Sequence, residues 1–345
     1  MKNRHLFYCL QLARSKNFGP KSFEQLLFKY GSPKKIVENI DEVPRVELAT
    51  DEEVWDEIEK VEKFGARFLS VMDDEYPAFL KEIPDCPIVL TLKGDASLLQ
   101  KRKLAIVGSR SASINSMKLA TDIAHEISEH NVVVVSGLAK GIDVAAHKGA
   151  LKKGTIAVIA GGIDNIYPKE NEEYFAKIAK NGLIISEQKF GSRPIGANFV
   201  ARNRIISALS DVVLIAEGTL KSGSMTTARF AFEQGKRIYA IPGSMMDERF
   251  AGTNALIKEK KADILSSVND LLAEFNVSVD DEVWEEEVKD VGNDDILGFL
   301  GYEPTFMGDL LDNLQISVSD LNIRLSELEL AGKIIINGEN VVLKK

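Results

Sequence analysis

The stretch 199–231 carries the residues best suited to chemistry. Arginines supply planar forks that bind phosphate, and an aromatic ring offers a face on which a base can stack. Small residues at a helix start let backbone N–H groups approach an oxyanion. The members of this set are Phe199, Arg202, Asn203 and Arg204, followed by Lys221, Ser222 and Gly223. Together they predict a site for a nucleic acid or a nucleotide.

These residues flank one of a series of predicted strands that must position them. The strands are 104–107, 132–135, 155–160, 183–185, 211–216 and 237–241. Each is a continuous apolar run, which is typical of parallel strands covered on both faces. Helical stretches such as 115–130 and 224–234 lie between them. We therefore predict an α/β fold with a Rossmann-like, doubly wound parallel sheet over 104–275.

Five loops that contain glycine follow the carboxyl ends of these strands, the edge at which open α/β sheets bind ligands. They are 108–110, 136–141, 161–164, 217–223 and 242–244. The first holds Ser109 and Arg110, and the second holds Gly137 and Lys140. Basic groups spread over several loops favour a polyanion that crosses this edge over a single small phosphate. For any one of these residues, a surface salt bridge or a helix cap is the alternative.

Length and composition limit the number of domains, the location of the protein and the class of its ligand. The 345 residues suggest two or three domains, and no apolar run or signal peptide indicates a membrane. The net charge is −9, but the segment 101–275 has 24 Lys and Arg against 18 Asp and Glu, so its charge is +6. This basic centre permits a phosphate-binding role.

The cysteine content bears on the redox setting. Only Cys9 and Cys86 are present, which argues against disulfides and cysteine zinc sites and favours a reducing, cytoplasmic setting.

The sequence lacks the motifs that are typical of NAD binding, P-loop, metal and nucleophilic sites. The run 108–113 is not GxGxxG, so an NAD site is not predicted, and GxxxxGK[ST] does not occur. No clustered carboxylates or HExxH motif predict a metal, and no nucleophile has a base placed beside it. The four histidines are scattered, as His5, His125, His130 and His147. We expect no catalytic residues, cofactor or metal, and hence a binding protein.

The regions outside the central sheet have different compositions. Residues 1–68 read as a helical domain, because Phe23, Leu26, Leu27 and Tyr30 recur at helical spacing. The Gly19-Pro20 turn resembles a helix-hairpin-helix that holds a DNA backbone, and a bundle that only packs is equally open. Residues 69–103 are expected to connect and pack on the central domain.

The remaining segments are an acidic linker, 276–293, and a small C-terminal domain, 294–345. Nine acids and one base occur within 280–295, a composition typical of solvated chain. Residues 294–345 predict three helices and a hairpin, arranged as a winged helix. Its would-be recognition helix from Ser317 to Gly332 is net negative, which favours a protein contact or a structural cap over DNA reading.

At the level of motifs, the chain resembles the DNA-processing protein A (DprA/Smf) family over its whole central domain. The residues that carry the resemblance are Gly108-Ser-Arg110, Ser136 to Asp143 with Ala146-His147, Gly162-Ile-Asp164 with Tyr167-Pro168 and Asn171, Ser186-Glu187, Phe199 with Arg202-Asn-Arg204, Ser222-Gly-Ser224 with Thr227-Ala228, and Pro242-Gly243. The flanking helical region is similar to the sterile-alpha-motif-like module of some members. The chain departs from the family pattern at Val200, Lys189 and Lys261-Ala262.

This resemblance implies a cytoplasmic, non-enzymatic protein that binds single-stranded DNA. It implies that incoming strands are protected during natural transformation and handed to the RecA recombinase, by a homodimer built through the Rossmann domain. Carried over position by position, the DNA-contacting candidates are Arg110, Lys140, Phe199, Arg202 and Arg204.

Two other functions stay open from the residues alone. The LOG-type phosphoribohydrolases, which cleave nucleotide 5'-monophosphates, share a Rossmann sheet and use an arginine and a glutamate near a PGGxGTxxE motif. Glu217-Gly-Thr219 and Pro242-Gly-Ser244 echo that motif in part, and its closing glutamate has no counterpart after Gly243. The third hypothesis is an adaptor that works through the acidic linker and the terminal domain.

Overall fold

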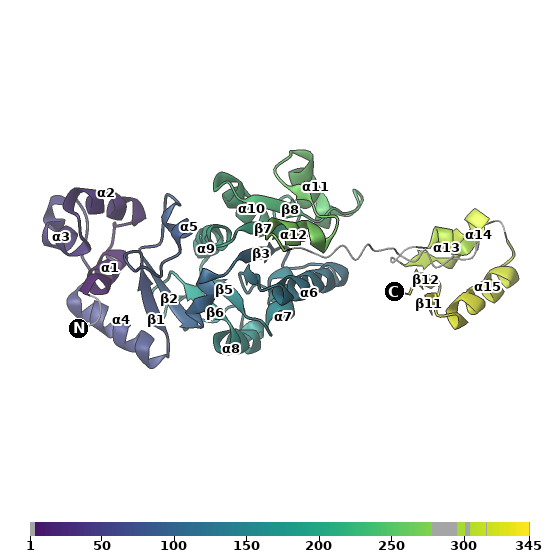
Figure 1. The fold of residues 1–345 in the computed structure, drawn as a ribbon, viewed down its shortest axis with the longest axis horizontal. Coiled ribbons are helices and arrows are strands. Elements are labelled where there is room, and N and C mark those ends of the chain that lie inside the picture. The colour runs from purple at the N-terminus through teal and green to yellow at the C-terminus, as the bar shows by residue number, and fades with distance from the viewer. Residues whose placement is uncertain (1–3, 278–294, 301–303, 315, 345) are drawn as a thin grey trace. The chain divides into compact units, whose positions relative to one another are not determined.

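The computed structural model describes residues 4–277, 295–300, 304–314 and 316–344 (Figure 1). The chain divides into two compact units, 1–278 and 279–345, and each is considered by itself. None of the helices in the described part combines the length and the apolar character that a bilayer crossing requires.

The first unit begins with a helical domain. Its helices are α1 (Arg4–Arg14), α2 (Pro20–Tyr30), α3 (Pro33–Glu38) and α4 (Asp51–Lys63), with a short 3₁₀ turn η1 (Ile40–Glu42). Proline opens α2 and α3, where its missing N–H has no helical partner to lose. Thr50 and Glu53 form a capping box that starts α4. The predicted helical domain is thus confirmed, except that its last residues enter a strand.

A nine-stranded sheet follows, in the order β1-β2-β6-β5-β4-β3-β7-β8-β9. The strands are β1 (Arg67–Ser70), β2 (Val89–Gly94), β3 (Lys103–Val107), β4 (Val133–Ser136), β5 (Thr155–Ile159), β6 (Leu183–Ser186), β7 (Val212–Ile215), β8 (Arg237–Ala240) and β9 (Asp263–Ile264). All six predicted parallel strands are present. The segment expected to be a connector supplies β2, which pairs antiparallel with β1 and β6. Both β1 and β9 went unpredicted, because β1 holds only two consecutive apolar residues, Phe68 and Leu69, and β9 is only two residues long.

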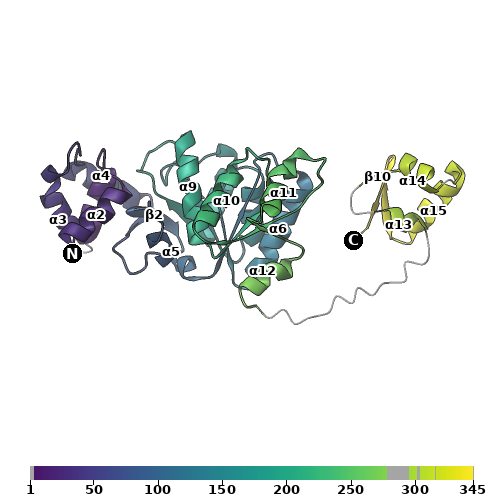
Figure 2. The same ribbon diagram turned by 90° about the horizontal axis from the view of Figure 1, so that it is seen from above.

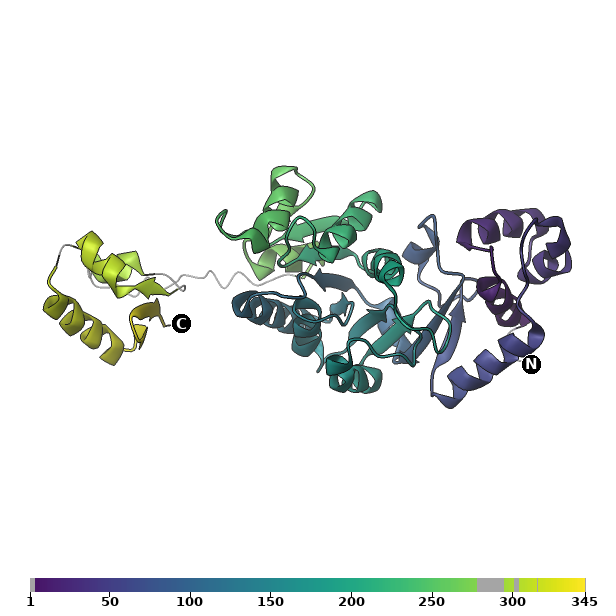
Figure 3. The same ribbon diagram turned by 180° about the vertical axis from the view of Figure 1, so that it is seen from behind.

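Helices cover both faces of the sheet (Figures 1 and 3). They are α5 (Ala78–Lys81), α6 (Ile114–Glu129), α7 (Ile142–Ala150), α8 (Glu172–Asn181), α9 (Gly196–Leu209), α10 (Gly223–Glu233), α11 (Ala251–Lys258) and α12 (Val268–Glu274), with 3₁₀ turns η2 (Ala96–Gln100), η3 (Lys169–Asn171) and η4 (Glu248–Phe250). Alternate strand residues point to opposite faces. Ala105 and Val107 of β3 pack with α9 and α10, whereas Leu104 and Ile106 pack with α6 and α7.

The chain reverses its direction across the sheet at β3. It adds β4, β5 and β6 on one side of β3, and then returns through α9 to place β7 on the other side. Figure 2 shows α9 beside α10 on the same face. Such a switch point opens a crevice at the carboxyl ends of the two strands. The loops after β3 and β7 therefore form the natural ligand-binding edge.

The second unit has its own small core. Its elements are α13 (Asp295–Phe299), β10 (Thr305–Phe306), α14 (Met307–Leu314), α15 (Val318–Leu330), β11 (Ile334–Asn337) and β12 (Asn340–Leu343), with sheet order β10-β12-β11. Ser317 caps α15 by accepting a hydrogen bond from the Asp320 N–H. Helix α14 begins at Met307, because Thr305 and Phe306 before it pair with β12. The winged-helix assignment stays a prediction, and most of the acidic linker lies outside the described residues.

Candidate functional site

Two adjoining cavities lie at the switch point of the sheet. The larger is a groove of about 440 Å³, lined by the loop after β3, by one face of α9 and by the start of α10. The smaller cavity, of about 50 Å³, lies between the loops after β4 and β5 and the start of α9. Arg110, Ala139 and Phe199 line both. Two cavities that share three lining residues therefore lie at the edge where the glycine loops predict a site.

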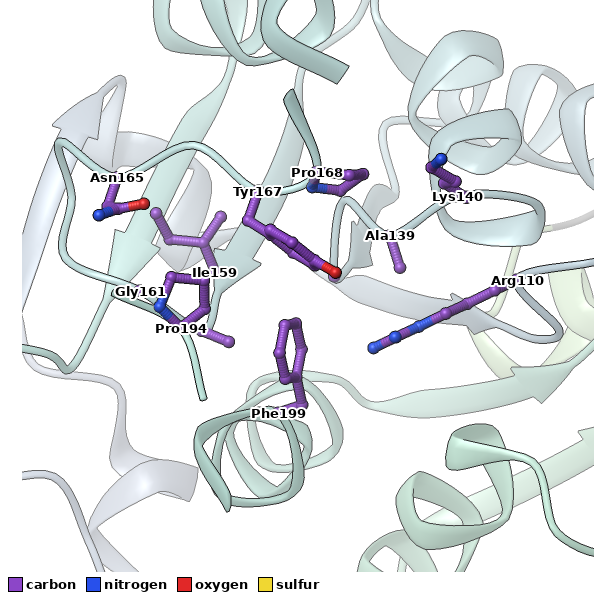
Figure 4. Close-up of a pocket in the computed structure, with 12 residues that line it drawn as sticks. Arg110, Ala139, Lys140, Ile159, Gly161, Asn165, Tyr167, Pro168, Pro194 and Phe199 are labelled. Atoms are coloured by element: carbon purple, nitrogen blue, oxygen red, sulfur yellow. The ribbon is translucent and has the colours of Figure 1, made fainter. Parts of the chain in front are cut away.

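Phe199 stands where the two cavities meet. The Arg110 guanidinium carbon lies 4.8 Å from the centroid of its ring, and Tyr167 packs edge-on against it at 5.5 Å. Figure 4 shows both side chains directed toward the Phe199 ring from separate loops. Arg110 is exposed and makes no ion pair with any carboxylate in the described part of the chain. A cation without an acidic partner beside a half-buried aromatic ring suits phosphate and base together.

Glycine is required where the first two loops meet. Gly141 has φ +75°, and a Cβ on it would lie 2.2 Å from the Ser109 carbonyl oxygen. A Cβ on Gly108 would lie 2.5 Å from Cγ1 of Ile142. Any side chain would thus separate the loop after β3 from the start of α7. The close approach brings Ser109 and Arg110 to the same edge as Lys140.

The loop after β4 is shaped by a buried carboxylate. Oδ2 of Asp143 accepts hydrogen bonds from the N–H groups of Gly137, at 3.2 Å, and Ala139, at 3.4 Å. Burial raises the pKa of this carboxyl group, and the Arg202 charge opposes the rise. Lys140, at the exposed end of the loop, forms a surface salt bridge with Glu170 at 2.8 Å. Such a pair is weak in water, so Lys140 can exchange Glu170 for another anion.

The far side of the groove is the start of α10. The Ser222 side chain caps the helix by accepting from the Ser224 N–H, and Gly223 is its first residue. The Asn203 amide of α9 donates to the Gly223 carbonyl at 3.2 Å, which ties the two helices together at the groove. Lys221 is exposed at this rim. Backbone N–H groups and hydroxyls at a helix start, and the partial positive charge of the helix dipole there, favour an anion here.

The two arginines of α9 have different surroundings from those predicted. Arg202 lines the floor of the groove but is only 6% exposed, and its Nη1 donates to the Val158 carbonyl. Burial lowers its pKa to about 10. The prediction that Arg204 contacts a polyanion is corrected. Its buried side chain binds both carboxylate oxygens of Glu187, at 2.9 and 2.7 Å, and lies 2.7 Å from the Asp85 carboxylate, away from the groove.

The residue set proposed from the sequence missed one wall of the smaller cavity. That wall is formed by Asn165, Tyr167, Pro168 and Pro194. The signal was present, because Gly161-Gly162 follows a parallel strand and opens a loop at the same edge. Of the predicted residues, Ser109, Arg110, Gly137, Lys140, Phe199, Arg202, Asn203, Ser222 and Gly223 line the cavities.

Two buried acid–base groups lie near the groove without lining it. Glu217 is fully buried, and its Oε2 accepts from the N–H and the hydroxyl of Ser113, which starts α6. Nδ1 of His147 lies 2.9 Å from the Thr155 hydroxyl, and burial lowers the His147 pKa to about 3. Within the described residues, no three His, Cys, Asp or Glu side chains gather as a metal site.

Comparison with known proteins gives matches over most of the chain. Residues 67–276 match the family model described as DNA recombination-mediator protein A, and residues 3–59 match the DprA-like N-terminal HHH domain. The DNA processing protein DprA of Streptococcus pneumoniae is 44% identical over 208 residues, which are 60% of this chain and 73% of the relative. DprA of Bacillus subtilis is 41% identical over 214 residues, 61% of this chain and 72% of the relative.

Two solved structures share the fold. The crystal structure of S. pneumoniae DprA superposes with a TM-score of 0.67 at 33% identity, covering 79% of this chain and 98% of that one. A structure that gives insight into the single-stranded DNA binding mode of DprA from Helicobacter pylori superposes with a TM-score of 0.57 at 34% identity. It covers 60% of this chain and 95% of the other.

Proposed function

Because this chain belongs to the DNA recombination-mediator protein A family, we propose that it binds single-stranded DNA without regard to sequence. The binding surface of this proposal is the groove at the switch point of its sheet, with the smaller cavity beside it. The chain acts in it as a binding protein and performs no bond-breaking step.

One observation carries the proposal: the Arg110 guanidinium, which has no ion pair among the described residues, lies on the Phe199 ring where both cavities meet. Arginine binds the phosphate backbone, and an aromatic face stacks with any base, because every base has a π-face. In double-stranded DNA the base faces are covered by their neighbours in the stack. A site built on stacking therefore favours the single strand.

The contacts belong to three sides of the groove. We assign them to Ser109, Arg110, Lys140, Phe199, Asn203, Lys221, Ser222 and Gly223. Gly137 and Arg202 form the inner wall, and Arg204 is left out because Glu187 and Asp85 already hold its guanidinium.

The similarity to the DprA proteins extends the proposal to the cell. The chain would protect incoming strands during natural transformation and pass them to the RecA recombinase, in the cytoplasm and as a homodimer formed through the Rossmann domain. The family description as a DNA recombination mediator supports a role in recombination, and the groove supports the binding step.

The phosphoribohydrolase alternative is not favoured. Its glutamate would have to reach a nucleotide, whereas Glu217 is fully buried and bound to Ser113. Incubation with AMP separates the two functions, since only the hydrolase releases adenine. Robust release of adenine would overturn the proposal.

Fluorescence anisotropy tests the binding step. A labelled oligothymidylate titrated at several salt concentrations should bind more tightly than a duplex of the same length, with an affinity that falls as salt rises. Arg110→Ala should weaken binding, while Arg67→Ala, which removes an exposed arginine from β1, should not. Equal binding of single and double strands, or undiminished binding by Arg110→Ala, would contradict the proposal.

A further inference from the structure

We infer that Arg202 is a positioning residue. Its guanidinium packs on Gly137, whose backbone also binds Asp143. Arg202 thereby sets the distance between α9 and the loop after β4 without touching the nucleic acid. The inference rests on the proposed function, because it says how that groove is held in shape. It also reverses the simplest interpretation of Arg202, which is that an arginine lining a phosphate groove binds phosphate.

The Arg202 guanidinium packs directly against Gly137. A Cβ built on Gly137 would lie 1.9 Å from Nη1 of Arg202 and 2.4 Å from Cζ, so the guanidinium occupies the space that any side chain would need. Nη1 also donates to the Val158 carbonyl on β5. Arg202 thereby fixes α9 to the loop after β4 and to the neighbouring strand.

Asp143 binds the backbone of the same glycine. Its carboxylate accepts from the Gly137 N–H and is buried with Arg202. The two opposite charges offset part of the cost of burying each other, and each shifts the titration of the other. The two side chains therefore meet at Gly137, one through its N–H and one over its Cα.

The elements joined at Gly137 carry the proposed contacts. The loop 137–141 carries Lys140, and α9 carries Phe199 one turn before Arg202. Residues three apart on a helix share a face, so holding Arg202 holds the Phe199 ring over the groove. Because its guanidinium is bound to the Val158 carbonyl and seated on Gly137, Arg202 is directed inward and not toward the opening.

Gly137→Ala is the sharpest test, because it changes no charge. The new methyl group must displace the guanidinium, which is the end of a flexible side chain, and the Gly137 backbone does not need glycine since its φ lies outside the left-handed region. We expect single-stranded DNA to bind about tenfold more weakly, which is the typical effect of losing a charged hydrogen bond. In an Arg202→Met background the same alanine should cause no further loss, because the clash is gone.

The salt dependence separates positioning from contact. Each phosphate contact on a single strand contributes about 0.7 to the slope of log K against log salt. Arg110→Ala should lower the slope by about that amount, whereas Gly137→Ala and Arg202→Met should weaken binding at an unchanged slope. A slope that falls in Arg202→Met as it does in Arg110→Ala would show a phosphate contact and overturn the inference.

Asp143→Asn tests whether removing a negative charge strengthens or weakens DNA binding. If only the charge near the phosphates matters, the affinity should rise. If the Asp143 carboxylate helps to hold Gly137 and Arg202 in place, the affinity should fall. Glu57→Gln is the matched control, because Glu57 is an equally buried carboxylate, paired with Arg14 in the helical domain. We expect both variants to unfold at lower temperature and only Asp143→Asn to lose affinity. Unchanged or tighter binding by Asp143→Asn would refute the positioning role.

Hydrogen exchange of the full chain decides the inference without DNA. If Arg202 joins the two elements, Gly137→Ala should speed exchange in both the loop 137–141 and the start of α9. Unchanged exchange in α9 would refute the inference. Failure of the wild-type protein to bind any single strand would instead refute the proposed function, and the exchange result would still stand.

Discussion

The guanidinium of Arg110 lies 4.8 Å from the centroid of the Phe199 ring, and this contact joins the loop after β3 to helix α9. The two residues are 89 positions apart, and no local pattern pairs them. Their contact places a cation and a stacking surface at the junction of the two cavities, so the same few atoms can bind a phosphate and a base. Each member of the pair can be tested separately.

Arg110→Lys should separate charge from shape. Lysine keeps the positive charge, so the salt dependence of DNA binding should stay near that of the wild type. It lacks the planar fork that lies on the ring and grips phosphate. We expect binding to weaken by about 1 kcal/mol, measured by anisotropy across salt concentrations. A lysine variant that binds as well as the wild type would show that only the charge is used.

Phe199→Ala should remove stacking and leave charge intact. Loss of one aromatic platform costs about 1–3 kcal/mol per stacked base, with the salt slope unchanged. The matched control is Phe232→Ala, which removes an exposed phenylalanine from the end of α10. Equal affinity of Phe199→Ala and the wild type would place the bases elsewhere.

Arg204→Met should act on stability alone. Its guanidinium is 5% exposed and holds Glu187, which is 21% exposed. Breaking such a pair leaves a carboxylate unpaired and costs about 3 kcal/mol in the free energy of unfolding. Urea unfolding measures that loss. At a temperature where the variant is folded, its DNA affinity and salt slope should equal those of the wild type, and a lower slope would return Arg204 to the DNA-binding surface.

His147 should make stability depend on pH. Burial, aided by the Arg202 charge, lowers its pKa from 6.5 to about 3. Thr155 donates its hydroxyl hydrogen to the Val134 carbonyl, so Nδ1 of His147 donates to the Thr155 oxygen, and the lowered pKa keeps the ring neutral. Between pH 6.5 and 3 the unfolded chain binds a proton that the folded chain does not. The contribution of His147 is therefore complete above pH 6.5 and is lost as the pH falls.

The comparison variant is His147→Gln, which cannot bind that proton. The difference in the free energy of unfolding between wild type and variant should shrink by about 1.4 kcal/mol for each pH unit below 6.5. Urea unfolding at pH 7, 6 and 5.5 measures it. A difference that stays constant would mean that His147 titrates alike in both states.

The sequence by itself was enough to predict the central sheet and the edge at which its glycine loops gather. Six apolar runs, five of them followed by a glycine loop, predict parallel strands, and parallel strands bring all their carboxyl ends to one edge. Arg110, Lys140 and Phe199 could therefore be assigned to one site before their contacts were known. Helical spacing also held a signal that went unused, since Phe199, Arg202, Asn203 and Ile206 share the groove face of α9 and Arg204 does not.

Only the tertiary structure decided what each arginine does. Arg202 and Arg204 are two residues apart on a helix, so they point to nearly opposite sides. One meets Gly137 and Val158, and the other meets Glu187 and Asp85. These partners come from distant parts of the chain. A charged side chain binds phosphate or stabilises the interior according to the groups that the fold places around it, and those groups are not its neighbours in sequence.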